Sequence, residues 1–120
     1  MYAAYQPQDK VILIRQGMDA PDIFRALSQE LAHAHMDRGE YNRADCAFTA
    51  YCVSYMLCKR NSIAVDTFRF DRLPEAFKEM DAQGIRAELG NIRDVANEIS
   101  RDMAPVLEQR KAPSRDDGAR

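Results

Sequence analysis

The longest uncharged stretch of the chain predicts a buried helix at the centre of the fold. Residues 46–58, CAFTAYCVSYMLC, contain no charged residue. As a helix this stretch would be roughly 20 Å long, and its apolar side chains would point nearly all round the axis. A bilayer span needs about 20 apolar residues, so we expect this shorter stretch to be buried in protein. The rest of a small domain must then pack around it.

The N-terminal pattern predicts a β-hairpin followed by a helix. Residues 2–6 and 10–15 flank the turn-forming cluster at residues 7–9, and the second segment, KVILIR, is rich in β-branched residues. Short segments of this kind on either side of a proline-containing turn favour two short strands. An aspartate cap, a proline in the first turn and a second acid then predict a helix over residues 20–37, which an Arg-Gly pair would end.

Three further helices are expected after the first. Asn42, with an acid three residues later, resembles a capping box and predicts a helix over residues 43–60. Pro74 predicts the start of a short helix at residues 73–80. A fourth helix is expected over residues 82–111, because its apolar positions form a regular stripe: Ile85, Leu89, Ile92, Val95, Ala96, Ile99, Met103, Val106 and Leu107.

Together these elements predict one α+β domain that is mostly helical. The chain of 120 residues is long enough for one core but not for two. In this domain, residues 1–111, a hairpin would pack beside about four helices arranged around the apolar helix at residues 43–60. Residues 112–120 contain proline, serine, glycine and mixed charge, have nothing to bury, and are expected to form a disordered tail.

Composition and charge exclude several classes of function. A net charge of −2 gives no general attraction to nucleic acid or to an anionic membrane, and no basic run with interleaved aromatic residues occurs. No apolar segment follows Met1, so we expect no signal peptide and a cytoplasmic protein. Cys46, Cys52 and Cys58 are each six residues apart, about 240° of helical rotation, so no two share a face for a metal or a disulfide. We expect them to be reduced and to fill the core.

Glu30 breaks the apolar pattern of the first predicted helix. It falls about 20° from Ile23 on the helical wheel, in the middle of the apolar stripe. Isolated burial of a carboxylate costs several kcal/mol, so this side chain must be paired, bound to a metal or held at the rim of the core. Glu30 is therefore the first candidate for a functional residue. The stripe around it consists of Ile23, Leu27, Leu31 and Ala34.

The residues around Glu30 reproduce most of a zinc-binding motif. In the motif His-Glu-x-x-His, two histidines at i and i+4 share a helix face and bind zinc, and the glutamate deprotonates the attacking water. Gln29, Glu30 and His33 occupy the three defining positions here, with glutamine where the first histidine would stand. The motif is therefore incomplete at its first ligand.

The chain resembles the ImmA/IrrE-like zinc metallopeptidases, in particular the peptidase-like domains that accompany ArdC-type antirestriction proteins of bacterial mobile elements. The resemblance lies in a short hairpin, a helix with the sequence ELAH, a glycine-containing loop and a second apolar helix, and it covers about residues 2–110. It implies a zinc peptidase in which His33 is a metal ligand and Glu30 is the general base. It also implies a third ligand from an acid of the second helix, where Asp45 is the only acid before Lys59.

Two of the three ligands that this resemblance implies are missing or displaced. A catalytic zinc needs three protein ligands and an open position for water. The amide oxygen of Gln29 is a poor zinc ligand beside imidazole, thiolate or carboxylate. Asp45 stands in the first turn of its helix, and the later positions where an acid is expected carry none. A thiolate of Cys46 or Cys52 could reach His33 from the facing helix, although both cysteines also suit the core.

The other polar residues near the motif are expected to have structural roles. His35 lies about 200° around the helix from His33, so the two cannot share one metal ion and His35 is expected on the solvent side. His33 and Glu30 would be buried or at the rim, hydrogen-bonded to each other or to a tyrosine hydroxyl of the second helix. Tyr51 and Tyr55, at i and i+4, could both face the first helix.

Three functions from different classes are consistent with the sequence. The favoured one is a catalytically inactive zincin-like domain of a bacterial mobile-element-associated protein, which acts as a binding or structural module and holds no metal. The second is an active zinc peptidase with an altered site, in which Glu30→Gln would abolish proteolysis. The third is a helical dimerisation or regulatory protein with residues 82–111 as its interface, which Ile99→Asp would disrupt. The expected partner is a protein or a second copy, not a membrane or nucleic acid.

Overall fold

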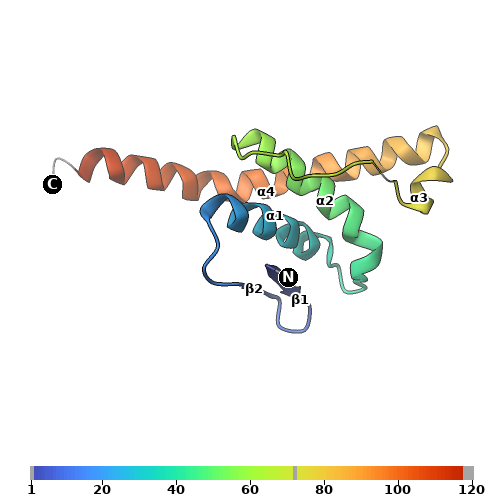
Figure 1. Cartoon of the computed structure of the whole chain (residues 1–120), viewed down its shortest axis with the longest axis horizontal. Coiled ribbons are helices and arrows are strands. Elements are labelled where there is room, and N and C mark those ends of the chain that lie inside the picture. The colour runs from blue at the N-terminus through green and yellow to red at the C-terminus, as the bar shows by residue number, and fades with distance from the viewer. Residues whose placement is uncertain (1, 72, 118–120) are drawn as a thin grey trace.

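The chain forms an N-terminal antiparallel hairpin followed by a group of packed helices (Figure 1). The computed structural model describes the backbone of residues 2–71 and 73–117 and the side chains of residues 2–71 and 73–103. The predicted α+β class, mostly helical with one hairpin and four helices in the described residues, is confirmed. The elements are, in order, β1 (Ala3–Gln6), β2 (Val11–Ile14), α1 (Ala20–Met36), α2 (Arg43–Arg60), α3 (Glu75–Lys78) and α4 (Ala82–Asp117).

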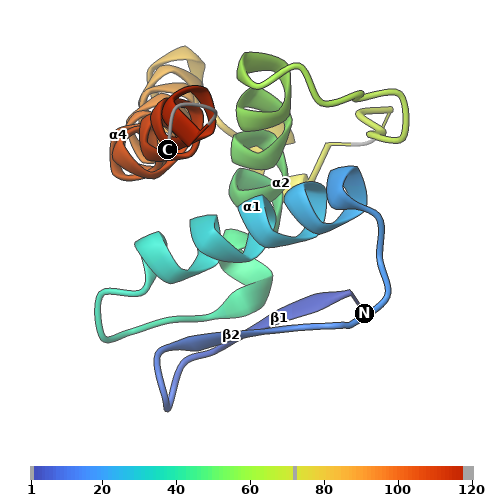
Figure 2. The same cartoon turned by 90° about the vertical axis from the view of Figure 1, so that its left-hand side faces the viewer.

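The hairpin has one face covered by α1 and one open face (Figure 2). β1 and β2 pair antiparallel, with Ala3 opposite Ile14 and Tyr5 opposite Ile12. Ala3 and Tyr5 are buried because their face of the hairpin packs on α1. Lys10 ends the turn with a φ of 57°, a left-handed conformation that helps the chain reverse direction between the strands. The predicted hairpin is therefore confirmed, and it positions β1 beside the motif helix.

Local signals predicted the junction between α1 and α2 well. Asn42 Oδ1 accepts a hydrogen bond from the Asp45 N–H at 3.1 Å and so satisfies one of the free amide groups of the first turn of α2. The preceding loop turns at Gly39, whose φ of 102° is disfavoured for residues with a side chain. This short loop brings the first turn of α2 back onto α1.

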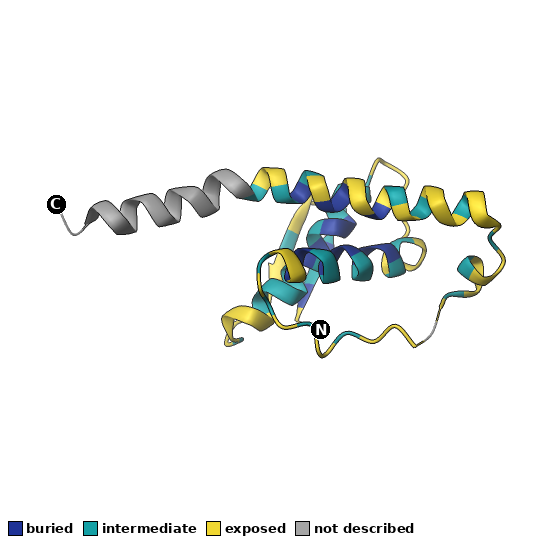
Figure 3. Cartoon of the chain, turned by 90° about the horizontal axis from the view of Figure 1, so that it is seen from above, coloured by how far each residue is buried: buried dark blue, intermediate teal, exposed yellow. Residues whose placement is uncertain are grey.

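α2 packs its buried face against both α1 and α4 (Figures 2 and 3), and α1 is the helix that also contacts both strands. Its buried residues Ala50, Val53 and Leu57 meet Ala32 of α1. Burial of each larger aliphatic side chain of this kind stabilises the fold by about 1.5–3 kcal/mol. Four residues in the middle of α4 complete the apolar core: Ile92, Val95, Ala96 and Ile99.

The outer face of α2 is covered by an aromatic segment instead of a helix. Tyr51 and Tyr55 pack on Phe68 and Phe70, which belong to the connection between α2 and α3. The ring centroids of Tyr51 and Phe68 lie 5.0 Å apart, and those of Tyr55 and Phe70 lie 5.2 Å apart. Tyr51 also lines a cavity together with residues of α1, so the expectation that both tyrosines face the first helix holds for Tyr51, whereas the ring contacts of Tyr55 are with the connection. An all-round apolar helix has several faces to bury, and this connection takes one of them.

The end of α4 also differs from the prediction. The helix was expected to end near residue 111, but it continues to Asp117. Residues 112–117, assigned by composition to a disordered tail, are therefore helical, and residues 118–120 lie outside the described part. Each residue that extends an existing helix adds one backbone hydrogen bond, so the helix can continue without a buried face. None of the helices in the described residues is long and apolar enough to span a membrane.

Among the described side chains, the apolar stripe of α4 is buried from Ile92 to Ile99 and exposed before it. Ile92 and Ile99 lie in the core, whereas Ile85 and Leu89, nearer the start of the helix, are exposed. Met103 packs partly against the core. The predicted stripe residues 106 and 107 have side chains outside the described part. The exposed residues show that the first turns of α4 extend beyond the other core helices, as Figure 3 also shows.

Candidate functional site

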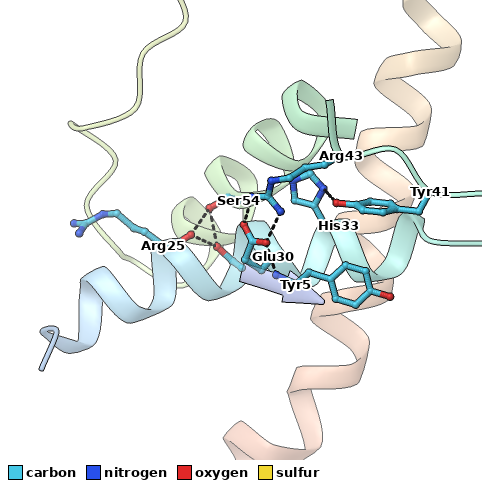
Figure 4. Close-up of polar contacts among 8 residues, drawn as sticks. Tyr5, Arg25, Glu30, His33, Tyr41, Arg43 and Ser54 are labelled. Atoms are coloured by element: carbon cyan, nitrogen blue, oxygen red, sulfur yellow. Dashed lines mark hydrogen bonds and ion pairs between the residues drawn. The ribbon is translucent and has the colours of Figure 1, made fainter. Parts of the chain in front are cut away.

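Glu30 is the centre of a buried polar cluster where β1, α1 and α2 meet (Figure 4). Only 3% of this residue is exposed. Arg43, in the first turn of α2, donates two hydrogen bonds to it, from Nη1 to Oε1 at 2.8 Å and from Nη2 to Oε2 at 2.7 Å. The backbone N–H of Tyr5 donates a third bond to Oε1, at 2.8 Å. Glu30 thus has the partner that its position demands, but the expected pairing with His33 or a tyrosine hydroxyl is wrong.

This cluster keeps Glu30 ionised. Burial alone would raise its pKa, but the hydrogen bonds from Arg43 and from the Tyr5 N–H, with the positive charge of Arg43, hold the pKa below its ordinary value. The hydrogen bond to Glu30 in turn raises the pKa of Arg43. A carboxylate already neutralised by a bidentate guanidinium has little tendency to accept another proton. Glu30 is therefore a structural anion in this fold and not a poised base.

His33 is fully buried one helical turn after Glu30. Its Nδ1 lies 2.7 Å from the hydroxyl oxygen of Tyr41, in the loop before α2, and its Nε2 makes no hydrogen bond within the described residues. Burial, followed by the positive charge of Arg43, lowers the pKa of His33, and the nearby Glu30 only partly opposes this. The imidazole is therefore neutral at neutral pH. The prediction of a buried, tyrosine-bonded histidine is right, but the tyrosine precedes the second helix.

A second ion pair fastens the hairpin to the end of α1. The Tyr5 hydroxyl donates to Asp37 Oδ2 at 2.7 Å, and Lys10 Nζ lies 2.9 Å from the same oxygen. The Gly39 N–H donates to Asp37 Oδ1 at 3.0 Å. These hydrogen bonds, that of Tyr5 foremost, lower the pKa of Asp37 to about 2. Tyr5 therefore links two carboxylates, through its backbone to Glu30 and through its hydroxyl to Asp37.

The other residues predicted from the motif do not gather at one point. Gln29 and Tyr51 line the same cavity as Glu30. Asp45, the implied third ligand, borders different hollows, which it shares with Glu88 of α4. Tyr51 therefore lies at the same cavity as Gln29 and Glu30 of α1, whereas Asp45 does not line that cavity. Tyr55 packs against Phe68 and Phe70 of the aromatic segment between α2 and α3.

The three cysteines are free thiols in different surroundings, and Cys46 borders a hollow together with Asp45 and Glu88. Cys46, Cys52 and Cys58 carry free thiols, and burial raises the pKa of each, for Cys52 to about 11. Cys52 packs against the apolar core. Across the part of the chain that the structure describes, no cysteine belongs to a group of three side chains that could hold a metal ion. No cysteine therefore replaces the missing first ligand beside His33.

The donor set does not fit a catalytic zinc ion. Within the described residues, no three side chains of His, Cys, Asp or Glu are arranged to hold a metal ion. Glu30 is already bonded to Arg43, whose guanidinium adds a positive charge beside His33 and would repel a divalent cation. Since three protein ligands and an open position are needed, the chemistry implied for Glu30 and His33 by the motif lacks its metal site.

His35 faces α4 and not open solvent. Its Nδ1 lies 3.4 Å from Glu98 Oε1, and its Nε2 lies 3.7 Å from Asp102 Oδ2. Only 24% of the His35 side chain is exposed. The expected solvent position is therefore wrong, because α4 passes along the side of α1 that was expected to be free. As expected, His35 does not share a site with His33.

A cavity of about 510 Å³ lies beside the polar cluster. Arg25 holds one wall in place, because its Nε donates to Ala64 O at 3.0 Å and its Nη1 to Asp22 at 2.7 Å. Tyr51 Oη, on another wall, accepts a hydrogen bond from the Arg69 N–H at 2.6 Å. The lining comes from β1, α1, α2 and the aromatic segment: Tyr2, Ala3, Asp22, Arg25, Ala26, Gln29, Glu30, Arg43, Tyr51, Thr67 and Phe68.

Comparison of the chain with protein-family models, with curated proteins and with solved structures gives no match. The geometry of the site itself therefore carries the functional argument.

Proposed function

We propose that this chain is a zincin-like domain without peptidase chemistry, which acts as a binding module in a bacterial mobile-element-associated protein. The resemblance to ImmA/IrrE-like peptidases supports the class, through the hairpin, the ELAH helix and the apolar helix that follows. The donor set around Glu30 and His33 supports the loss of catalysis. The cavity beside this cluster supports the retention of binding.

The single observation that carries the loss of catalysis is the bidentate contact between Arg43 and Glu30. A general base in peptide hydrolysis must take a proton from water that a metal has activated. Here both carboxylate oxygens accept hydrogen bonds from a guanidinium, and one also accepts the Tyr5 N–H. The carboxylate of Glu30, which would be the base, instead connects α1 to β1 and α2 through hydrogen bonds.

The cavity suits an extended peptide segment of a partner protein. The Tyr5 N–H points away from β2 toward Glu30, and Ala3, two residues earlier on the same strand, presents its N–H and C=O to the same side. Ala3 lines the cavity, so a peptide there can pair with its backbone. The charges in the lining are paired as Arg25 with Asp22 and Arg43 with Glu30, which favours an uncharged peptide over a strongly acidic or basic one.

Metal analysis tests the first half of this proposal. Zinc per chain is measured on protein purified without a histidine tag, together with proteolysis of an unfolded protein substrate. We expect no stoichiometric zinc and no cleavage, for the wild type and for His33→Ala alike. About one zinc per chain, lost in His33→Ala, together with cleavage lost in Glu30→Gln, would overturn the proposal in favour of an active peptidase.

Amide NMR tests the second half. A pool of random nonapeptides, added to ¹⁵N-labelled protein, is expected to shift the amide signals of Ala3, Gln29 and Phe68. Thr67→Arg, which places a long side chain in the cavity lining, should remove these shifts and leave the rest of the spectrum unchanged. The absence of any shift at these residues at millimolar peptide would reject the cavity as a peptide site.

A further inference from the structure

β2 is an apolar strand with little cover. It consists of Val11, Ile12, Leu13 and Ile14, and three of the four are exposed, by 45%, 59% and 43% for Val11, Leu13 and Ile14. Strands at the edge of a sheet usually carry charged residues, proline or a bulge that discourage pairing with another chain. The four residues of β2 carry none of these.

The outer edge of β2 presents backbone groups that β1 does not use. The Arg15 N–H donates to Tyr2 O at 2.8 Å, so Tyr2 and Arg15 form a hydrogen-bonded pair. In an antiparallel ladder such pairs alternate with non-hydrogen-bonded ones, so Ile12 and Ile14 direct their N–H and C=O groups away from β1. The sheet ends at β2 in the described structure. Four backbone groups are therefore available at this edge.

We propose that β2 pairs antiparallel with β2 of a second copy, so that two hairpins form one four-stranded sheet. In the matching register Ile12 of each copy lies opposite Ile14 of the other, and all four outward groups of each strand are used. Leu13 then lies opposite Leu13 of the second copy, on the two-fold axis. A two-fold contact of this kind is closed, because each strand presents the same surface to the other.

The sequence of β2 fits a second copy because it is self-complementary in this register. Both faces of the paired strands are apolar at every position from Val11 to Ile14. The flanking charges do not oppose each other, since Arg15 lies opposite Val11 of the second copy and Lys10 lies opposite Gln16. Like charges directly opposite would destabilise the pair. A two-stranded sheet is also marginal by itself, so a four-stranded one gives each hairpin more support.

This contact goes beyond the proposed binding function and leaves the cavity free. The cavity lies at the other edge of the hairpin, along β1, and α1 covers one face of both strands. Two strands of four residues make a small interface, well below the roughly 1,600 Å² of a standard one. We therefore expect a dimer in measurable equilibrium with the monomer, and not a permanent one.

Sedimentation velocity over a range of protein concentrations tests this inference. The wild type is expected to shift from monomer toward dimer as its concentration rises to a few hundred micromolar. Leu13→Lys places two ammonium groups opposite each other and should weaken dimerisation at least tenfold. Ile14→Pro removes an outward N–H but no hairpin bond, because proline is tolerated on the free side of an edge strand, and should have a similar effect.

Leu89→Lys is the matched control. Leu89 on α4 is exposed by 56%, close to the 59% of Leu13, so both variants replace an equally exposed leucine. Leu89→Lys should leave dimerisation unchanged. A dimer that Leu89→Lys abolishes and the β2 variants spare would place the interface on α4 and overturn the inference. So would a wild type that remains monomeric throughout the concentration range.

A cysteine cross-link checks the register through the gain of a covalent dimer instead of the loss of a dimer. Opposite residues of a non-hydrogen-bonded pair have Cα atoms about 4.5 Å apart, within the range of a disulfide. Leu13→Cys should therefore form a covalent dimer on mild oxidation, and Leu89→Cys and the wild type should not. Equal cross-linking of Leu13→Cys and Leu89→Cys would indicate random collision and contradict the proposed pairing.

Discussion

The two sides of α1 are buried by different chemistry. On the side of α2 and α4 most of the buried contacts are apolar, with Leu57 and Ile99 fully buried among aliphatic neighbours, although Ser28 and Ser54 form a buried hydrogen bond there. On the side of the hairpin and the first turn of α2, Glu30 and His33 are buried, and the partly exposed Arg43 pairs with Glu30 (Figure 4). Apolar contacts are tolerant of direction, whereas a bidentate ion pair requires one arrangement of its partners. The apolar side therefore provides most of the stability, and the polar side fixes where the hairpin and α2 sit.

The largest effect is expected on the apolar side. Leu57→Ala removes a fully buried side chain from the centre of the core. The loss of burial and the cavity left behind should lower the free energy of unfolding by about 4 kcal/mol. Urea denaturation measures this, and the loss should be the same at every pH at which the protein folds. A loss below about 1 kcal/mol would contradict the assignment of Leu57 to the main core.

Arg43→Ala should have the next largest effect. It leaves the carboxylate of Glu30 buried without its cation, which costs about 3–5 kcal/mol for a buried pair, and we expect about 3 because Arg43 is partly exposed. Adding Glu30→Gln removes the unpaired charge and should recover more than half of this loss. The low pKa of Glu30 adds a pH signature. The contribution of the pair is present above the ordinary glutamate value and declines as the pH falls through the folded pKa.

A variant at His33, with a control at His35, isolates the effect of the lowered pKa of His33 on stability. The pKa of His33 is lowered in the folded protein. Below about pH 6.5 the unfolded chain therefore binds a proton at His33 that the folded protein does not bind. Stability should therefore fall as the pH drops below that value, by at most about 1.4 kcal/mol per pH unit. His33→Gln should flatten this part of the profile, and His35→Gln serves as its control. Equal slopes for the wild type and His33→Gln would show that His33 is not the group responsible.

The smallest effect is expected at the serine contact between α1 and α2. The Oγ atoms of Ser28 and Ser54 lie 2.7 Å apart, and that of Ser54 is 3.1 Å from Arg25 O. Ser28→Ala should cost about 1 kcal/mol of unfolding free energy, because Ser54 retains its second partner. Ser28→Ala combined with Ser54→Ala should cost little more. A cost above about 3 kcal/mol for Ser28→Ala would mean that this contact stabilises the packing of α1 on α2 as strongly as the Arg43–Glu30 pair stabilises the other side.

Local signals explain what the sequence predicted correctly. The cap at Asn42, the glycine turn and the period of the apolar stripes each involve neighbours within a few residues, so the elements and their order could be predicted. The anomaly at Glu30 was visible for the same reason, because its place on the wheel depends only on helical geometry. The pairing of Glu30 with Arg43 could not be predicted in this way. Arg43 is thirteen residues away, and the contact exists only because a loop returns the next helix to α1.

Faces of helices were harder to assign than their bounds. α2 is apolar nearly all round, so its pattern gave no reason to place Tyr55 against the aromatic segment that contains Phe68 and Phe70 instead of against α1. Ile99 shows the same difficulty on α4. It belongs to a stripe that could serve a core or a partner, and its full burial means that Ile99→Asp would test folding instead of dimerisation. Leu89 is the informative position on that helix.

The ion pair between Arg43 and Glu30 also bears on how such a domain could evolve. Gln29→His alone would complete the histidine pair of the zincin motif, but the guanidinium would still occupy Glu30 and repel a cation. Loss of Arg43 alone would leave a buried carboxylate unpaired and destabilise the fold. Each single step toward a metal site is therefore either without benefit or harmful, and the two together would still lack a third ligand, because Asp45 borders different hollows. Such epistasis would make a metal site difficult to gain by point mutation.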